Sequence, residues 1–183
     1  SPIAPLVDEL NGNYSFIGND GPTFYFQTDA GAARAKVVAV NVLAKDRKWI
    51  DVVPESAETL GSVDFINDQF VLNYLKDAYT QIKIVDRSGK FVRSVDLPGI
   101  GSAGGFGGKR YDTETFYSYS SYNAPPTIYR YDMKTGKSTL FRQAKVIGGL
   151  YRSLGQEGES VAAALRAGRI LLTDPTLIKL LLH

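Results

Sequence analysis

Apolar side chains alternate with polar ones in short runs along most of the first 140 residues. Near the start, for example, Phe24 and Phe26 flank Tyr25. A period of two in segments rich in aromatic and β-branched residues is typical of strands with two different faces. Asn, Asp, Gly and Pro interrupt these runs at the positions expected for turns. The sequence therefore predicts a mainly β protein built from short strands.

The predicted strands fall into three groups of four, and the stretch 61–98 shows the pattern best. The order of segments and turns in this stretch occurs once before it and once after it. The expected segments are 14–19, 23–29, 36–43 and 49–54 in the first group, 62–68, 69–78, 80–86 and 91–98 in the second, and 104–112, 114–119, 127–132 and 138–143 in the third. The pattern is less regular at the start of the third group, over 104–112, than elsewhere.

Two internal markers indicate true repetition. Turn aspartates at Asp20, Asp68 and Asp112 lie 48 and 44 residues apart, and a turn of the form D-x-x-(x)-G-K begins at Asp86 and again, 46 residues later, at Asp132. A period of 40 to 50 residues with four strands per unit is typical of propeller blades. We therefore predict a partial β-propeller over residues 1–146, with antiparallel blades at about 13–55, 61–98 and 104–143.

A set of three blades is a sector rather than a closed ring. One four-stranded sheet cannot bury both of its faces alone, whereas stacked blades can. Because a closed propeller needs at least about four blades, the two terminal faces should be exposed unless something covers them. A homo-oligomer is one solution, since two sectors could close into a symmetric ring of six blades.

The character of the chain changes after Val146. Residues 157–167 have helix-forming composition, and Asp174 followed by Pro175 resembles the start of a second helix. The last segment is apolar nearly all round, so we expect it to be buried on a blade face or against another copy. The predicted fold is thus three blades with one or two C-terminal helices in residues 147–183.

Composition excludes several classes of protein. The net charge is only +2 and the two signs are interspersed, which argues against nucleic-acid binding. The chain has no cysteine, so it has neither disulfides nor thiolate sites. We expect a soluble protein, because no stretch resembles a secretory signal or a membrane span. This is consistent with a cytoplasmic location or with recombinant expression.

Two motifs resemble functional sites, but each lacks neighbouring features that its chemistry requires. Residues 99–104 satisfy G-x-G-x-x-G, yet more glycines follow where a dinucleotide site needs the start of a helix. Ser160 lies in half of a nucleophile elbow, and the only histidine is His183. We therefore predict no catalytic residues, no metal site and no cofactor.

Several longer stretches resemble a known family. N-G-N-Y-S-F-I-G-N-D-G-P-T-F-Y-F-Q-T-D-A, V-V-P-E and D-T-E-T-F-Y-S-Y-S-S-Y-N-A-P-P-T-I-Y-R-Y-D look like the later blades of the β-propeller of bacterial prolyl oligopeptidases. The resemblance covers residues 4–146. It implies a seven-bladed propeller that restricts entry by size to a hydrolase domain that cleaves peptides after proline.

The resemblance does not extend beyond Val146, and no hydrolase residues can be carried over. We therefore expect a non-catalytic scaffold, an engineered chimera in which three blades are joined to an unrelated helical segment. A second hypothesis is a designed protein-binding module. A third is a propeller piece that needs a separate hydrolase domain. The candidate interface residues are Leu177, Ile178, Leu180 and Leu181 in the tail and Tyr117 and Tyr119 in the third blade.

Overall fold

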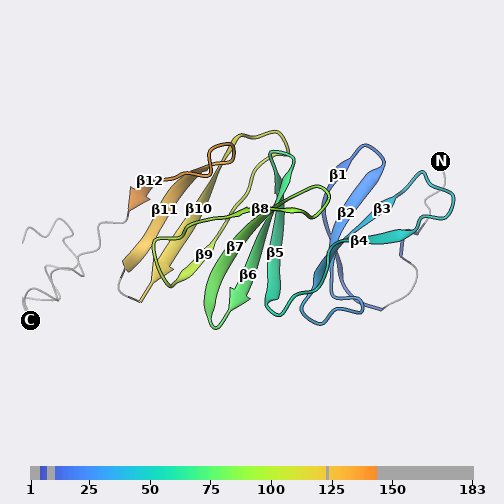
Figure 1. Cartoon of the computed structure of the whole chain (residues 1–183), viewed down its shortest axis with the longest axis horizontal. Helices are drawn as coiled ribbons and strands as arrows, with labels where there is room; N and C mark the ends of the chain where they lie inside the picture. Colours follow the sequence, from blue (N-terminus) through green and yellow to red (C-terminus); the bar gives the residue numbers. More distant parts are fainter. Residues whose placement is uncertain (1–4, 8–10, 123, 144–183) are drawn as a thin grey trace, which may run out of the picture. The chain divides into compact units, whose positions relative to one another are not determined.

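The computed structural model of the chain describes residues 5–7, 11–122 and 124–143. These residues form three four-stranded antiparallel sheets and contain no helix (Figure 1). Within each sheet the strands follow one another in chain order. The strands are β1 (Tyr14–Asp20), β2 (Thr23–Thr28), β3 (Lys36–Asn41) and β4 (Trp49–Val53) in the first sheet, β5 (Thr59–Ile66), β6 (Gln69–Lys76), β7 (Tyr79–Asp86) and β8 (Phe91–Ser94) in the second, and β9 (Ser102–Gly104), β10 (Glu114–Ser121), β11 (Ala124–Asp132) and β12 (Ser138–Gln143) in the third.

Because the strands are antiparallel, the connections between them lie alternately at two opposite ends of the sheets. The β1–β2, β5–β6 and β9–β10 connections meet at one end of the sheets, which we call end A and which lies along the top of Figure 1. The chain passes up and down each sheet, so β3–β4, β7–β8 and β11–β12 also connect at end A. The remaining connections lie at the opposite end, called end B.

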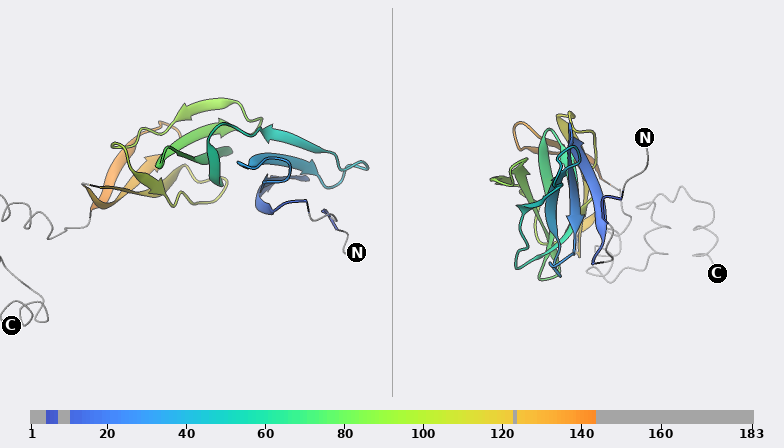
Figure 2. Two further views of the ribbon diagram at one scale, coloured as in Figure 1. Left: turned by 90° about the horizontal axis from the view of Figure 1, so that it is seen from below. Right: turned by 90° about the vertical axis from the view of Figure 1, so that its right-hand side faces the viewer.

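The second sheet is buried on both faces, as expected for a sheet between two others. On β6, Phe70 and Leu72 pack toward the first sheet, and Val71 packs toward the third. Each of these three side chains is at most 1% exposed. Burial of apolar area at about 25 cal/mol per Å² makes these two junctions the main source of stability in the described part of the chain. Figure 2 shows the three sheets from two further directions.

The junction between the first and second sheets is aromatic. The ring of Tyr25 lies 5.6 Å from Phe65 and 5.0 Å from Phe70, both in edge-on geometry. At the other junction the third sheet contributes a stack of its own rings, with Phe106 on Tyr117 at 4.8 Å and Tyr117 on Tyr129 at 5.3 Å. The Tyr25 pairs, which join two sheets, favour a defined register between them, because aromatic rings attract best at particular angles.

The outer faces of the first and third sheets carry exposed aromatic residues. On the first sheet Phe16 is 56% exposed, although its ring contacts Phe24 and Phe26 at 5.5 Å. On the third sheet Phe116 and Phe141 are 37% and 61% exposed and lie 4.9 Å apart. The expectation of two exposed terminal faces thus agrees with the exposure of these rings.

The predicted strands overlap the observed ones, with ends that differ by up to four residues, except at the start of the third sheet. The prediction of a strand at residues 104–112 is wrong, since β9 is confined to Ser102–Gly104 and residues 105–113 form a long connection. Glycines cause the difference. Gly105 has a φ of +81°, which a strand cannot accommodate, and its neighbours Gly107 and Gly108 offer no side chains to pack.

The predicted C-terminal helices fall in residues 147–183, which lie outside the described residues. The interpretation of this segment as part of an engineered chimera therefore stays a prediction. The boundary expected at residue 146 also stays a prediction, because the described residues end at Gln143.

Candidate functional site

Arg110 joins all three sheets at end A. It lies in the long β9–β10 connection, and its Nε donates to Asp68 Oδ1 at 2.6 Å in the second sheet. Its Nη2 donates to Asp20 Oδ1 at 2.8 Å, and its Nη1 to the backbone oxygen of Asn19 at 3.0 Å, both in the first sheet. Arg87 of the β7–β8 turn also pairs with Asp20. We call these residues, Asn19, Asp20, Asp68, Arg87 and Arg110, the arginine junction.

The backbone conformation of the β5–β6 turn orients the Asp68 carboxylate of the arginine junction. Asn67 and Asp68 have φ angles of +52° and +55° and form a two-residue hairpin turn between β5 and β6. Asn and Asp tolerate this left-handed conformation better than other residues with side chains. The backbone N–H of Asp68 also donates to the backbone oxygen of Arg110 at 3.0 Å. The turn therefore binds both the backbone and the side chain of the arginine.

The electrostatics of the junction favour the charged states of Asp20 and Arg110. Hydrogen bonding from Arg110 lowers the pKa of Asp20 below its usual value, and the charge of Arg87 adds to this effect. Hydrogen bonding to Asp68, and then to Asp20, raises the pKa of Arg110. The guanidinium also lies 5.3 Å from the centre of the Phe65 ring, which places it over an apolar surface. Asp20 and Arg110 are therefore held as an ion pair whose role is to link the sheets.

A second arginine links the second and third sheets. Arg93 on β8 donates from Nε to the hydroxyl of Tyr131 at 3.0 Å, and from Nη2 to the backbone oxygen of Met133. Tyr131 is fully buried. The two arginines therefore satisfy polar groups that would otherwise lie unpaired where sheets meet.

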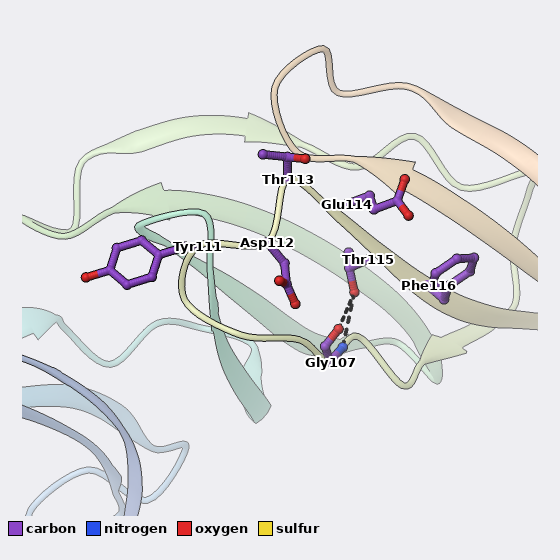
Figure 3. A pocket seen from close by; sticks show the side chains of 7 residues that line it. All are labelled: Gly107, Tyr111, Asp112, Thr113, Glu114, Thr115 and Phe116. Atoms are coloured by element: carbon purple, nitrogen blue, oxygen red, sulfur yellow. Dashed lines mark hydrogen bonds between the residues drawn. The ribbon is translucent and has the colours of Figure 1, made fainter.

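Two surface hollows are lined by described residues. One of about 510 Å³ lies beside the β9–β10 connection (Figure 3). Thr115 is 1% exposed and bonds to the backbone of Gly107, whereas the ring of Tyr111 extends away from the other labelled side chains. The other, of about 390 Å³, lies on the outer face of the first sheet, where Tyr14, Trp49 and Lys36 are among the residues that line it. Neither contains a pair of groups arranged for proton transfer or nucleophilic attack.

The candidate interface tyrosines face another sheet of the same chain. Tyr117 and Tyr119 are 1% and 5% exposed and belong to the core between the second and third sheets. As they lie here they contribute to packing, and a partner could reach them only if the sheets separated. The other candidates, Leu177, Ile178, Leu180 and Leu181, lie outside the described residues.

The glycine motif at residues 99–104 serves close packing. No helix follows it in the described part of the chain, so the geometry of a dinucleotide site is missing. A Cβ atom at Gly101 would lie 2.3 Å from the backbone oxygen of Ser120, which only glycine avoids. The backbone oxygen of Gly101 accepts a bond from Thr80, which ties this segment to the second sheet.

Sequence reasoning found the aspartates of the arginine junction but missed the arginine. Asp20 and Asp68 were singled out by their spacing, whereas Arg110 has no counterpart in the other two repeats. Residues 5–7, 11–122 and 124–143 contain no group of three or more side chains suited to a metal ion. Over the same residues no helix is long and apolar enough to cross a bilayer.

The sequence and the fold both match known proteins. The profile of the family described as "Prolyl oligopeptidase, N-terminal beta-propeller domain" matches residues 1–144. The prolyl endopeptidase of Elizabethkingia miricola is 36% identical over 143 residues, which are 78% of this chain and 20% of that protein. The dual function macrocyclase-peptidase of Galerina marginata is 29% identical over 147 residues, or 77% of this chain and 20% of that protein.

Solved structures agree with these sequence matches. One from a structural and mechanistic analysis of two prolyl endopeptidases superposes with a TM-score of 0.70 at 33% identity, covering 75% of this chain and 20% of its own. The apo prolyl oligopeptidase B of Galerina marginata gives 0.71 at 26% identity, covering 77% of this chain and 21% of its own. The chain spans about a fifth of the length of these relatives. It therefore belongs to the prolyl oligopeptidase family, in which it matches part of the N-terminal β-propeller domain.

Proposed function

We propose that this chain supplies a non-catalytic structural sector of a prolyl oligopeptidase propeller. In such an enzyme the three sheets would form part of the wall that restricts entry of peptides to a separate hydrolase domain. The proposal rests above all on the junctions between sheets, where nearly every large side chain is used for packing or for linking one sheet to the next. The family match is confined to the propeller domain, which also favours a role without chemistry.

Peptidase assays with the full chain test the first half of this proposal. A chromogenic peptide with proline before the scissile bond should not be cleaved, because the single histidine is His183 and no nucleophile elbow is present. Turnover that copurifies with the protein and is abolished by a serine-directed inhibitor would disprove the absence of catalysis.

A sector exchange tests the second half. Residues 1–143 would replace the matching fifth of the Elizabethkingia miricola prolyl endopeptidase. The exchanged enzyme should cleave the short chromogenic peptide and discriminate against a long unfolded protein as the parent enzyme does. The matched control is the parent enzyme without this sector, which should lose that discrimination. An exchanged enzyme that folds but digests the long protein freely would contradict a wall function.

The exposed aromatic residues support a second candidate, association through the outer faces. Phe16 and Phe141 lie on opposite outer faces, so two copies could stack head to tail as the sheets do within the chain. Light scattering would show a dimer that Phe16→Glu returns to a monomer.

A second experiment tests the tail. The double variant Leu177→Glu with Leu181→Glu should abolish folding if the tail is buried within the chain, and should leave a folded monomer if the tail is an interface.

A further inference from the structure

End A carries an excess of positive charge. From the last residue of each strand through the connection that follows it, this end has nine Lys and Arg against six Asp, a net charge of +3. The described connections at end B, counted in the same way, have two Lys and Arg against five Asp and Glu, a net charge of −3. The charge of the sheets is therefore separated along the strand direction, although the signs are mixed along the sequence.

The two signs at end A also differ in exposure. Five of the six aspartates, Asp20, Asp68, Asp86, Asp112 and Asp132, are partly buried as whole residues, although the side chains of Asp20 and Asp68 are still 39% and 44% exposed. Eight of the nine basic side chains are exposed, and Arg110 is the exception. The exposed ones are Lys45, Arg47, Lys48, Arg87, Lys90, Lys109, Lys134 and Lys137.

The repeated D-x-x-(x)-G-K turn explains this difference for two of the sheets. Asp86 accepts hydrogen bonds from the backbone N–H groups of Ser88 and Lys90, at 2.8 and 3.1 Å. Asp132 accepts from Lys134 and Thr135, both at 2.8 Å. The pKa of Asp86 is lowered first by a hydrogen bond from the Ser88 hydroxyl, at 2.6 Å, and then by these backbone bonds, and the pKa of Asp132 is lowered by the bonds from Thr135 and Lys134. In each turn the carboxylate is therefore bonded to backbone N–H groups of the same turn, and the lysine side chains are exposed to solvent.

Few of these exposed charges have a partner in the chain. Of the eight exposed Lys and Arg side chains, only Arg87 is within 4.0 Å of a carboxylate of the described residues. Exposed lysines keep their hydration and their mobility, so they can turn toward an approaching anion at little cost. A surface of this kind raises the rate at which an oppositely charged partner binds.

We propose that end A is a docking surface for an acidic peptide segment. Seven of the eight exposed basic residues lie on the last connection of a sheet, so an extended chain rich in Asp and Glu can contact two sheets at once. A nucleic acid fits less well, since it requires a dense basic surface, and Asp86 and Asp132 lie at the base of the lysine-bearing turns. This surface does not depend on the proposed role of the sheets in a peptidase.

Binding of a fluorescein-labelled hepta-glutamate peptide to the full chain, followed by anisotropy, tests the proposal. The peptide should bind in 50 mM salt and weaken steadily up to 300 mM salt, because exposed charges are screened. Lys90→Glu with Lys137→Glu should weaken binding about tenfold, a size expected from losing two exposed ion pairs and gaining repulsion. The double variant Lys90→Gln with Lys137→Gln removes the two positive charges without adding negative ones, and it should therefore weaken peptide binding less.

The matched control is Arg34→Glu with Lys76→Glu, which changes the net charge by the same amount at end B. This control should alter the affinity less than twofold. The proposal fails if the peptide does not bind at 50 mM salt, or if the two double variants weaken it equally, since overall charge would then be responsible. Tighter binding of a single-stranded 15-mer DNA than of the peptide would also overturn it in favour of a nucleic acid.

Discussion

Replacing Arg110 tests whether the arginine junction holds the three sheets together. Arg110→Met keeps most of the side-chain length and the contact with Phe65, but it removes all three hydrogen bonds to the first and second sheets. The Arg110 side chain is only 20% exposed, so water replaces these bonds poorly. Asp20 and Asp68 are 39% and 44% exposed, however, and regain water when the arginine is lost.

These exposures set the size of the expected effect. A hydrogen bond to a charged group contributes about 1.5–3 kcal/mol when its partner is left unsatisfied. Because both carboxylates can be rehydrated, we expect a total loss of about 2 kcal/mol rather than the sum of three such bonds. For a unit of this size, that loss lowers the melting temperature by about 4–8 °C.

The assay is urea unfolding of the full chain followed by the fluorescence of Trp49, the only tryptophan. Its ring lies 5.4 Å from Tyr14 and 5.5 Å from Phe26, in the first sheet. It therefore reports whether a change in the third sheet destabilises the first. Arg130→Met is the control, because Arg130 is 53% exposed and its pair with Glu114 is long at 3.6 Å. A loss in Arg110→Met no greater than in this control would refute the reasoning.

Three further changes have outcomes that the structure predicts. Tyr131→Phe removes the hydroxyl bonded to Arg93 and should cost about 1 kcal/mol in urea unfolding, whereas a neutral result would show that water replaces the bond. Gly89→Ala should lower the melting temperature far more than Gly21→Ala, since a Cβ at residue 89 would lie 1.8 Å from a backbone oxygen of β4, whereas residue 21 has open space around it. Hydrogen bonding lowers the pKa of Asp20 in the folded state, so its contribution is present above the usual pKa near 4 and is lost as the pH falls below it. Urea midpoints measured from pH 5 to pH 2 should therefore fall less steeply in Asp20→Asn than in the unchanged protein, and parallel curves would contradict this.

Much of the fold could be predicted because its signals are local. Alternation along a strand depends on the pleat of that strand alone, and turns depend on a few residues with special backbone preferences. The pattern around Phe24 and Phe26 therefore identified β2 without any knowledge of its neighbours. The same reasoning failed at residues 105–113, where a long glycine-rich connection follows three residues of strand.

The sequence by itself determined three repeated four-strand units and membership of a propeller family, because both follow from residue order over short distances. Only the tertiary structure decided which side chains meet across the sheets. Arg110 lies 42 residues from Asp68 and 90 from Asp20, and the stacking of the sheets brings all three together. The tertiary structure also buried Tyr117 and Tyr119 and separated the positive and negative charges between end A and end B. Sheet faces and strand ends acquire neighbours only when whole sheets pack together.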